Sequence, residues 1–245
     1  MALPAYAVDP DAVLKNVPED VKWRTGIPNY AKAHNFFQKH KTTNHKTGSL
    51  EDIVQNLVKN WEKEASHKTD PRQWDTVDLD NYQFSCNGLN KYNGQEMLTK
   101  GTYNALLGES MYYSASSISF EDSHDAFRNT LGDGFAWELL EVFSGPPHVT
   151  FTWRHFGTMT NEFKCTGLSG IPYNVKPSNK MVEIFGMCKA TVNDQLKIQD
   201  LQVFYDPNQL FVQLLETCPH AAFIGMKLPG SANEDQSSAA TEKSN

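Results

Sequence analysis

One long helical stripe, followed later by a run of strand-like segments, restricts the fold of this 245-residue chain more than any other feature. Ser49 suits a helix N-cap, and Asp52 occupies the partner position of a capping box. Apolar residues then recur at helical spacing, at Leu50, Ile53, Val54, Leu57, Val58 and Trp61. The spacing predicts an amphipathic helix over residues 49–66 that ends before Asp70 and Pro71.

Turn residues divide the second half of the chain into segments with strand character. Apolar and aromatic residues alternate with polar ones, or run continuously, over residues 135–143, 149–156, 181–192 and 196–205. A long helix followed by an antiparallel meander predicts an α+β fold. We expect one strongly curved sheet that holds helix 49–66 in its concavity, a loop over residues 164–180 and a short closing helix over residues 208–216.

The organisation outside this core follows from composition. Four prolines among residues 1–48 exclude a long helix there, so we expect an N-terminal extended arm with one helix over residues 29–41. The main domain is expected over residues 49–228, with an insertion near residues 70–128 that holds a weak strand and a helix interrupted at Gly101. Small and polar residues over 229–245 predict a disordered tail.

Charge, hydropathy and cysteine spacing exclude several classes of protein. The formal net charge of −7 argues against a nucleic-acid partner, which favours a basic surface. No apolar run approaches the roughly 20 residues of a membrane helix, and no basic stretch precedes an apolar one at the N-terminus, so we expect no membrane partner and a cytoplasmic location. The four cysteines lack CxxC spacing and are interpreted as reduced, buried thiols.

Motifs for nucleotides, metals and hydrolytic nucleophiles do not occur in the sequence. We find no GxGxxG, Walker A, HExxH or GxSxG, and the eight histidines form no ligand pattern. We therefore expect neither a cofactor nor a metal. Two classes of function remain, namely acid–base chemistry without a cofactor and ligand binding without chemistry.

Three short motifs resemble those of the SnoaL-like polyketide cyclases in order and spacing. Residues 153–163 (WRHFGTMTNEF) are similar to a strand and turn that in the family reads apolar-x-G-T-H-T-G-E-F. Residues 182–186 (VEIFG) resemble the strand that follows it. The closing D-x-x-G-L-x-x-Q-L signature of the family is similar to the pattern Asp206-x-x-x-Leu210-x-x-Gln213-Leu214.

The chain also resembles the plant pathogen-related proteins, a branch of the same superfamily, over residues 20–217. The similar features are Lys22-Trp23-Arg24, residues 48–51 before a helix that ends in Trp61-Glu62, the Asp70-Pro71 stop, and Tyr205-Asp206. The resemblance implies a cone of nuclear transport factor two-like fold, with a pocket between sheet and helix. In SnoaL-like cyclases a carboxylate in that apolar pocket closes a polyketide ring by cofactor-free aldol chemistry.

Three positions depart from the cyclase motifs. The family histidine is Met159 here, the following glycine is Asn161, and the glycine of the closing motif is Gln209. His155 lies four residues before Met159 on the same predicted strand face, which displaces it by about 13 Å at ~3.3 Å per residue. A catalytic His155 would therefore act from a different place in the pocket.

Three residues are candidates for the acid–base chemistry. Asp206 ends an apolar strand, where a carboxylate at a pocket mouth suits proton transfer, although it equally suits capping the helix that follows. His155 is a candidate proton shuttle or a hydrogen-bonded core histidine. Glu183 lies in an apolar strand and is either a second acid–base group or the ion-pair partner of Arg154.

Aromatic residues in the strands and the long helix are candidate ligand contacts for a flat, hydrophobic molecule. They are Trp61, Trp137, Phe151, Trp153, Phe185, Phe204 and Tyr205. The alternative is that they form plain core or a subunit interface. We expect a homodimer through the outer face of the sheet, where Ile184 and Leu201 would leave apolar surface.

Three functions remain open. The first is an isomerase or lyase, a cyclase or dehydratase, that acts by general acid–base chemistry on a hydrophobic polyketide-like or terpenoid small molecule. The alternative is a non-catalytic, defence-associated protein that binds such a molecule in the same cone. The third is an assembly protein that uses the open sheet face to self-associate. The missing family histidine favours binding, and the aspartate in the closing motif favours catalysis.

Overall fold

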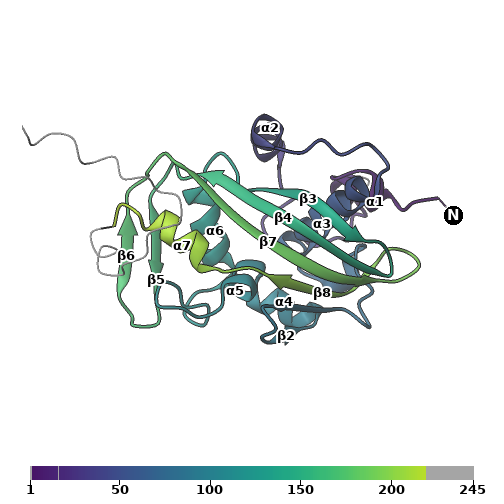
Figure 1. The fold of residues 1–245 in the computed structure, drawn as a ribbon. Helices are drawn as coiled ribbons and strands as arrows, with labels where there is room; N and C mark the ends of the chain where they lie inside the picture. The colour runs from purple at the N-terminus through teal and green to yellow at the C-terminus, as the bar shows by residue number, and fades with distance from the viewer. Residues whose placement is uncertain (1, 16, 219–245) are drawn as a thin grey trace, which may run out of the picture.

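The computed structural model describes residues 2–15 and 17–218 (Figure 1). The predicted tail at residues 229–245, and the last ten residues of the expected main domain, lie outside these described residues. The fold is α+β, as predicted: a curved sheet crosses the molecule, and its inner face packs on helices (Figure 1).

Helix α3 (Leu50–His67) is the predicted amphipathic helix. The Ser49 side chain accepts a hydrogen bond from the Asp52 backbone N–H at 3.3 Å, whereas the Asp52 carboxylate accepts from the N–H of Gly48 at 2.9 Å. The helix therefore begins as the sequence predicts, with the reciprocal bond shifted by one residue. Val54, Leu57 and Trp61 of its apolar stripe are buried in the core.

The main sheet has six strands. In spatial order they are β2 (Lys91–Tyr92), β1 (Gln83–Cys86), β8 (Ile198–Phe204), β7 (Met181–Val192), β4 (His148–Thr158) and β3 (Ala136–Ser144). The four strands predicted in the second half are antiparallel neighbours, which confirms the meander. The sheet is mixed rather than wholly antiparallel, because β1 pairs with β8 in parallel.

Four helices close the fold around this sheet. They are α4 (Gly94–Lys100), α5 (Thr102–Leu107), α6 (Phe120–Thr130) and α7 (Asn208–Leu214). The expected interruption at Gly101 is present, with a positive φ of 85° that favours glycine. A Cβ there would lie 2.8 Å from the ring of Phe120, so Gly101 also allows α6 to pack against this corner.

Two elements differ from the prediction. The expected loop over residues 164–180 instead carries an antiparallel hairpin, β5 (Phe163–Thr166) and β6 (Pro172–Val175), since strands this short leave little periodicity to detect. Helix α6 was not predicted, because its sequence FEDSHDAFRNT is mostly polar. Its start signal is nevertheless present: the Ser119 side chain accepts from the Asp122 N–H at 3.0 Å.

The N-terminal arm folds onto the main body through three short elements, α1 (Ala5–Val8), η1 (Ala12–Leu14) and α2 (Ala31–His40). The buried Asn60 of α3 holds the first two: its amide donates to the carbonyls of Tyr6 (3.1 Å) and Asp9 (2.7 Å) and accepts from the N–H of Val13 (3.1 Å). Helix α2 packs two phenylalanines on the outer face of the sheet.

The two faces of the sheet carry different chemistry. On β4, Phe151 and Trp153 point into the main core, whereas Arg154 and Phe156 point outward beneath α2. Trp153 lies across Gly186 of β7, where a Cβ would come within 2.4 Å of the indole. Because Gly186 has no side chain, the indole can lie flat on the neighbouring strand.

The prediction that Ile184 and Leu201 form an apolar outer face is wrong. Both side chains point inward and are almost fully buried, because the alternation of β7 and β8 places them with the core residues. The apolar side chains that β7 leaves exposed are Phe185 and Met187.

Candidate functional site

The three predicted acid–base residues do not lie together. His155 faces the interior, where its ring stacks on Phe135 at 3.6 Å between centroids. Glu183 lies on the opposite face of the sheet. Asp206 follows β8 and is exposed; its carboxylate accepts from the backbone N–H and side-chain amide of Asn208, at 2.9 and 3.0 Å. These contacts close the turn before α7, whose N-cap position is Pro207 and carries no side-chain cap.

Glu183 is paired with Arg154, as the structural alternative expected. The Arg154 Nε donates to Glu183 at 2.9 Å, and its Nη1 donates to Glu138 at 3.0 Å. Glu138 is fully buried and also accepts from the backbone N–H groups of Thr42 (2.5 Å) and Thr43 (2.7 Å). This outer triad, Glu138, Arg154 and Glu183, fastens the N-terminal arm to the sheet.

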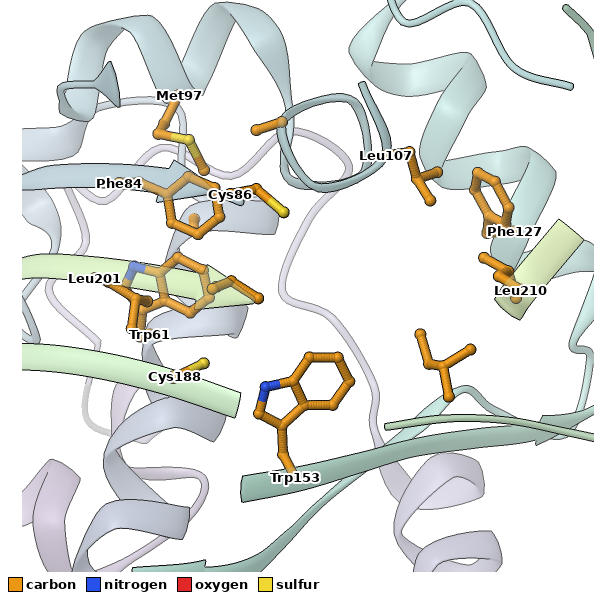
Figure 2. Close-up of a cluster of buried hydrophobic side chains, with 14 of the residues drawn as sticks. Trp61, Phe84, Cys86, Met97, Leu107, Phe127, Trp153, Cys188, Leu201 and Leu210 are labelled. Carbon is orange, nitrogen blue, oxygen red and sulfur yellow. The ribbon is translucent and has the colours of Figure 1, made fainter. Parts of the chain in front are cut away.

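The predicted aromatic ligand contacts divide between the two faces. Trp61, Phe151 and Trp153 are buried in the core, and Figure 2 shows the Trp153 indole reaching from β4 into the interior. Trp61 stacks on Phe84 and donates to the Tyr82 hydroxyl at 3.0 Å, as a core residue does. Trp137 and Tyr205 are half-buried on the same inner side. Phe185 and Phe204 belong to the outer face, beside Met187.

Glu62 of α3 is a half-buried carboxylate that was not among the predicted acid–base residues. All the remaining residues from Asn60 to Lys68 are buried, whereas the Glu62 side chain keeps 40% of its surface accessible. Its carboxylate accepts from the Tyr30 hydroxyl at 2.9 Å and from Ser66 at 3.1 Å, and it lies 3.8 Å from Arg128 Nη2. Burial alone would raise the pKa of Glu62, but Arg128 and these hydrogen bonds hold it below its usual value.

Two histidines beside Glu62 are held neutral. Arg128 Nη2 donates to His67 Nε2 at 2.8 Å, so that ring nitrogen must accept and the proton resides on Nδ1. Burial, reinforced by the Arg128 charge, lowers the pKa of His67 to about 4 and that of His124 to about 3. His124 Nε2 lies 2.9 Å from the Thr102 hydroxyl.

His155 completes this arrangement from the sheet. Its Nε2 lies 3.2 Å from the Phe135 carbonyl, which can only accept, so Nε2 carries the proton and Nδ1 keeps a lone pair. Burial lowers the pKa of His155 to about 4, against the opposing effects of the Phe135 hydrogen bond and of the Glu62 charge.

Six side chains at and around Glu62 keep accessible surface: Tyr30, Glu62, Tyr103, Arg128, Phe135 and His155. Burial raises the pKa of Tyr103 to about 12 and lowers that of His155 to about 4, so both rings lie close against other protein groups. We name the partly accessible surface that these six residues present the Glu62 recess.

Another hollow, of about 890 Å³, lies on the surface between η2 (Pro71–Gln73) and α4, apart from the Glu62 recess. Its walls are mostly polar and include Asp70, Arg72, Asn81 and Gln95. Asp70 and Arg72 are already paired with each other at 2.6 Å. Lys22 and Asp80 also line this surface hollow, which is therefore a charged and mostly polar site.

Residues 2–15 and 17–218 contain no group of three histidine, cysteine or acidic side chains placed to hold a metal ion. Among the helices of this same part of the chain, none has the length and hydropathy needed to cross a bilayer. All four cysteines are buried and free, as predicted.

The comparison with known sequences decides the family. A barley (Hordeum vulgare) protein named "Pathogen-related protein" is 35% identical over 208 residues, which cover 82% of this chain and 84% of that protein. This chain belongs to the pathogen-related protein family. The predicted resemblance to that branch is thereby confirmed. No family model matches the chain.

Solved structures with a similar fold share less sequence identity with this chain. A candidate SnoaL-like polyketide cyclase from Jannaschia sp. CCS1 is 15% identical, covers 72% of this chain and 99% of its own length, and has a TM-score of 0.36. A Catenulispora acidiphila protein of ketosteroid isomerase-like fold, solved with trimethylamine, is 10% identical, covers 64% of this chain and 90% of its own, and has a TM-score of 0.34.

The neutral histidines predict a distinctive loss of stability in mild acid. A histidine whose pKa falls from 6.5 in the unfolded chain to about 4 or 3 in the fold stabilises the protein above pH 6.5 and loses that contribution as pH falls. Carboxylates with lowered pKa values lose their stabilising contribution only below about pH 4.5. Burial raises the pKa of Glu64, which therefore has the opposite effect between pH 6.5 and 4.5, so the histidine contribution is read from the difference between wild type and a histidine variant.

We expect His124→Phe, which keeps the ring stacked on Phe120, to flatten this slope by about 1 kcal/mol per pH unit. Urea unfolding at half-unit pH steps measures it. His148→Phe is the matched control, because the His148 ring is exposed at the start of β4. Equal slopes in the wild type and His124→Phe would show that His124 is not held neutral.

Proposed function

We propose that this protein binds a hydrophobic small molecule in the Glu62 recess and transfers a proton at a carbon next to a carbonyl group, without a cofactor. Cyclisation, isomerisation and dehydration of polyketide-like or terpenoid carbonyl compounds all begin with that step. The observation that carries the proposal is an ionised carboxylate, Glu62, hydrogen-bonded to a tyrosine and placed beside an arginine and an aromatic wall.

Each group has a role that follows from its protonation state. Glu62 is ionised and accepts the proton, while the Tyr30 hydroxyl, whose pKa is raised well above its usual value by burial, stays protonated and donates its one hydrogen to Glu62, which positions the carboxylate. Arg128 stabilises the negative charge that develops on the carbonyl oxygen. His155 offers a second acceptor at Nδ1 on the opposite wall.

The experiment that tests the proposal uses a model ketone. Catalysed exchange of the α-protons of 2-tetralone in D2O, followed by NMR, should exceed the buffer rate and saturate with ketone concentration. A protein that binds 2-naphthamide, a neutral ligand of similar size, but leaves the exchange at the buffer rate would be a binding protein without this chemistry. A protein that binds neither compound would contradict the recess itself.

The non-catalytic alternative is favoured by one observation. The pKa of Glu62 lies below its usual value and those of His67 and His155 are about 4, so all three groups are weak bases near neutral pH, where efficient acid–base groups have pKa values closer to the ambient pH. A defence-associated binding protein would use the same recess and the same aromatic contacts. The exchange measurement separates the two functions.

A homodimer through the outer face of the sheet is also part of this proposal. Phe185 and Met187 on β7 are 48% and 40% exposed, and adjacent exposed apolar residues of this kind are typical of an interface. Light scattering at micromolar concentration should give twice the 27.6 kDa of one chain, and Phe185→Ser should shift the mass toward the monomer. A wild-type mass of 27.6 kDa would overturn the dimer.

A further inference from the structure

The guanidinium of Arg128 is only partly used within the protein. Its hydrogen bonds to His67 (2.8 Å) and Tyr30 (3.4 Å), and its approach to Glu62 (3.8 Å), all involve Nη2. Within residues 2–15 and 17–218, neither Nε nor Nη1 of Arg128 has a hydrogen-bond partner. The side chain keeps 39% of its surface accessible, so these donors are available to a ligand.

Arg128 is the cation that remains available to a ligand in the recess. His67 and His124 are neutral, and the 3.8 Å separation from Glu62 is too long for a direct hydrogen bond. Two other cations are already paired: Lys63 with the Pro10 carbonyl at 2.6 Å and Asp11 at 3.3 Å, and Arg24 with Glu121 at 2.7 Å and the Leu98 carbonyl at 2.8 Å. An anionic group that enters the recess therefore meets Arg128.

We infer that the ligand is a hydrophobic carboxylic acid, whose carboxylate accepts hydrogen bonds from Nε or Nη1 of Arg128 while its apolar body packs on Tyr103 and Phe135. This inference rests on the proposed function and specifies its substrate class. An apolar molecule alone would leave the Arg128 donors desolvated and unpaired, which is costly, whereas a carboxylate restores a charge-assisted hydrogen bond. The ionic contact also orients the ligand, with its acid end at α6 and its body toward the sheet.

The test uses two ligands of the same shape, 2-naphthoate and 2-naphthamide, with calorimetric titration. Arg128→Gln should weaken naphthoate binding by about tenfold, the effect of one partly exposed charge-assisted hydrogen bond, and should change naphthamide binding by less than about twofold. Arg128→Lys keeps the charge but not the planar donors, so its affinity for naphthoate should lie between those of the wild type and Arg128→Gln. Added salt should weaken naphthoate binding alone.

Arg72→Gln is the matched control, because Arg72 is an exposed arginine of the surface hollow. Loss of naphthoate binding in Arg72→Gln and not in Arg128→Gln would place the anion in that hollow and overturn the inference. Equal losses of both ligands in Arg128→Gln would show that the residue only shapes the recess, and would overturn it too. Failure of naphthamide to bind the wild type would instead count against the proposed function.

Discussion

Glu62→Gln should slow catalysed α-proton exchange on 2-tetralone by about 10²–10⁴-fold, with little change in the affinity for 2-naphthamide. Glutamine keeps the shape of the side chain and can still accept from Tyr30, but it cannot take up the proton, and general acid–base catalysis typically contributes a factor of this size. Glu141→Gln is the matched control, since Glu141 is exposed on β3.

Asp206→Asn decides between two candidate bases. The closing motif predicts that Asp206 carries the proton, whereas its exposed position and its bonds to Asn208 are those of a turn residue, which asparagine replaces well. If exchange collapses in Asp206→Asn and survives in Glu62→Gln, the assignment from sequence is correct and the role proposed for Glu62 is wrong.

Arg154→Met should lower the free energy of unfolding by about 3–5 kcal/mol, because it removes the cation between two carboxylates and leaves Glu138 buried without a counter-charge. The hydrogen bonds from Thr42 and Thr43 to Glu138 place the effect toward the lower end of that range. The pKa of Glu138, now held below its usual value, should rise in the variant.

Urea unfolding of Arg154→Met and of Lys180→Met measures the difference. Lys180 pairs with Glu216 at 2.8 Å, but both side chains are more than half exposed, so its loss should cost at most about 1 kcal/mol. Similar costs for the two variants would show that the outer triad does not fasten the N-terminal arm to the sheet.

The periodic parts of this fold could be predicted from the sequence, and the reason is visible in α3 and β7. Each buries a regular pattern of apolar side chains, so the pattern gives both the element and its inner face. Helix α6 was not predicted because its buried side chains include Ser123, His124 and Thr130, so its inner face lacks a continuous apolar stripe. The hairpin β5–β6 was not predicted because strands of four residues are too short to show a clear alternation of apolar and polar side chains.

The candidate site was harder to predict for the same reason. Glu62 falls next to Trp61 and off the apolar stripe of α3, where a solvated glutamate is the ordinary interpretation. Its partners Tyr30 and Arg128 come from the N-terminal arm and from α6, so only the folded chain brings them together. The spacing of His124 and Arg128, one helical turn apart, was the signal that would have placed two polar groups on one inward face.

His155 and Arg154 show what a strand pattern can and cannot give. The alternation of β4 correctly places His155 on the same face as Trp153, and Arg154 on the other. The alternation does not show which face of the sheet α2 covers. It therefore does not decide whether Glu183 contacts a ligand or an arginine. The contact with Arg154 is the interpretation that the sequence slightly favoured, and it keeps Glu183 on the outer face of the sheet.

A crystal structure of the protein with bound 2-naphthamide tests the central claim most directly. We expect the naphthalene ring between α3 and β4, against Phe135 and Tyr103, with its amide within hydrogen-bond distance of Glu62 or Arg128. A ligand found instead in the surface hollow around Arg72, or on the exposed face of β7, would contradict the assignment of the Glu62 recess as the functional site.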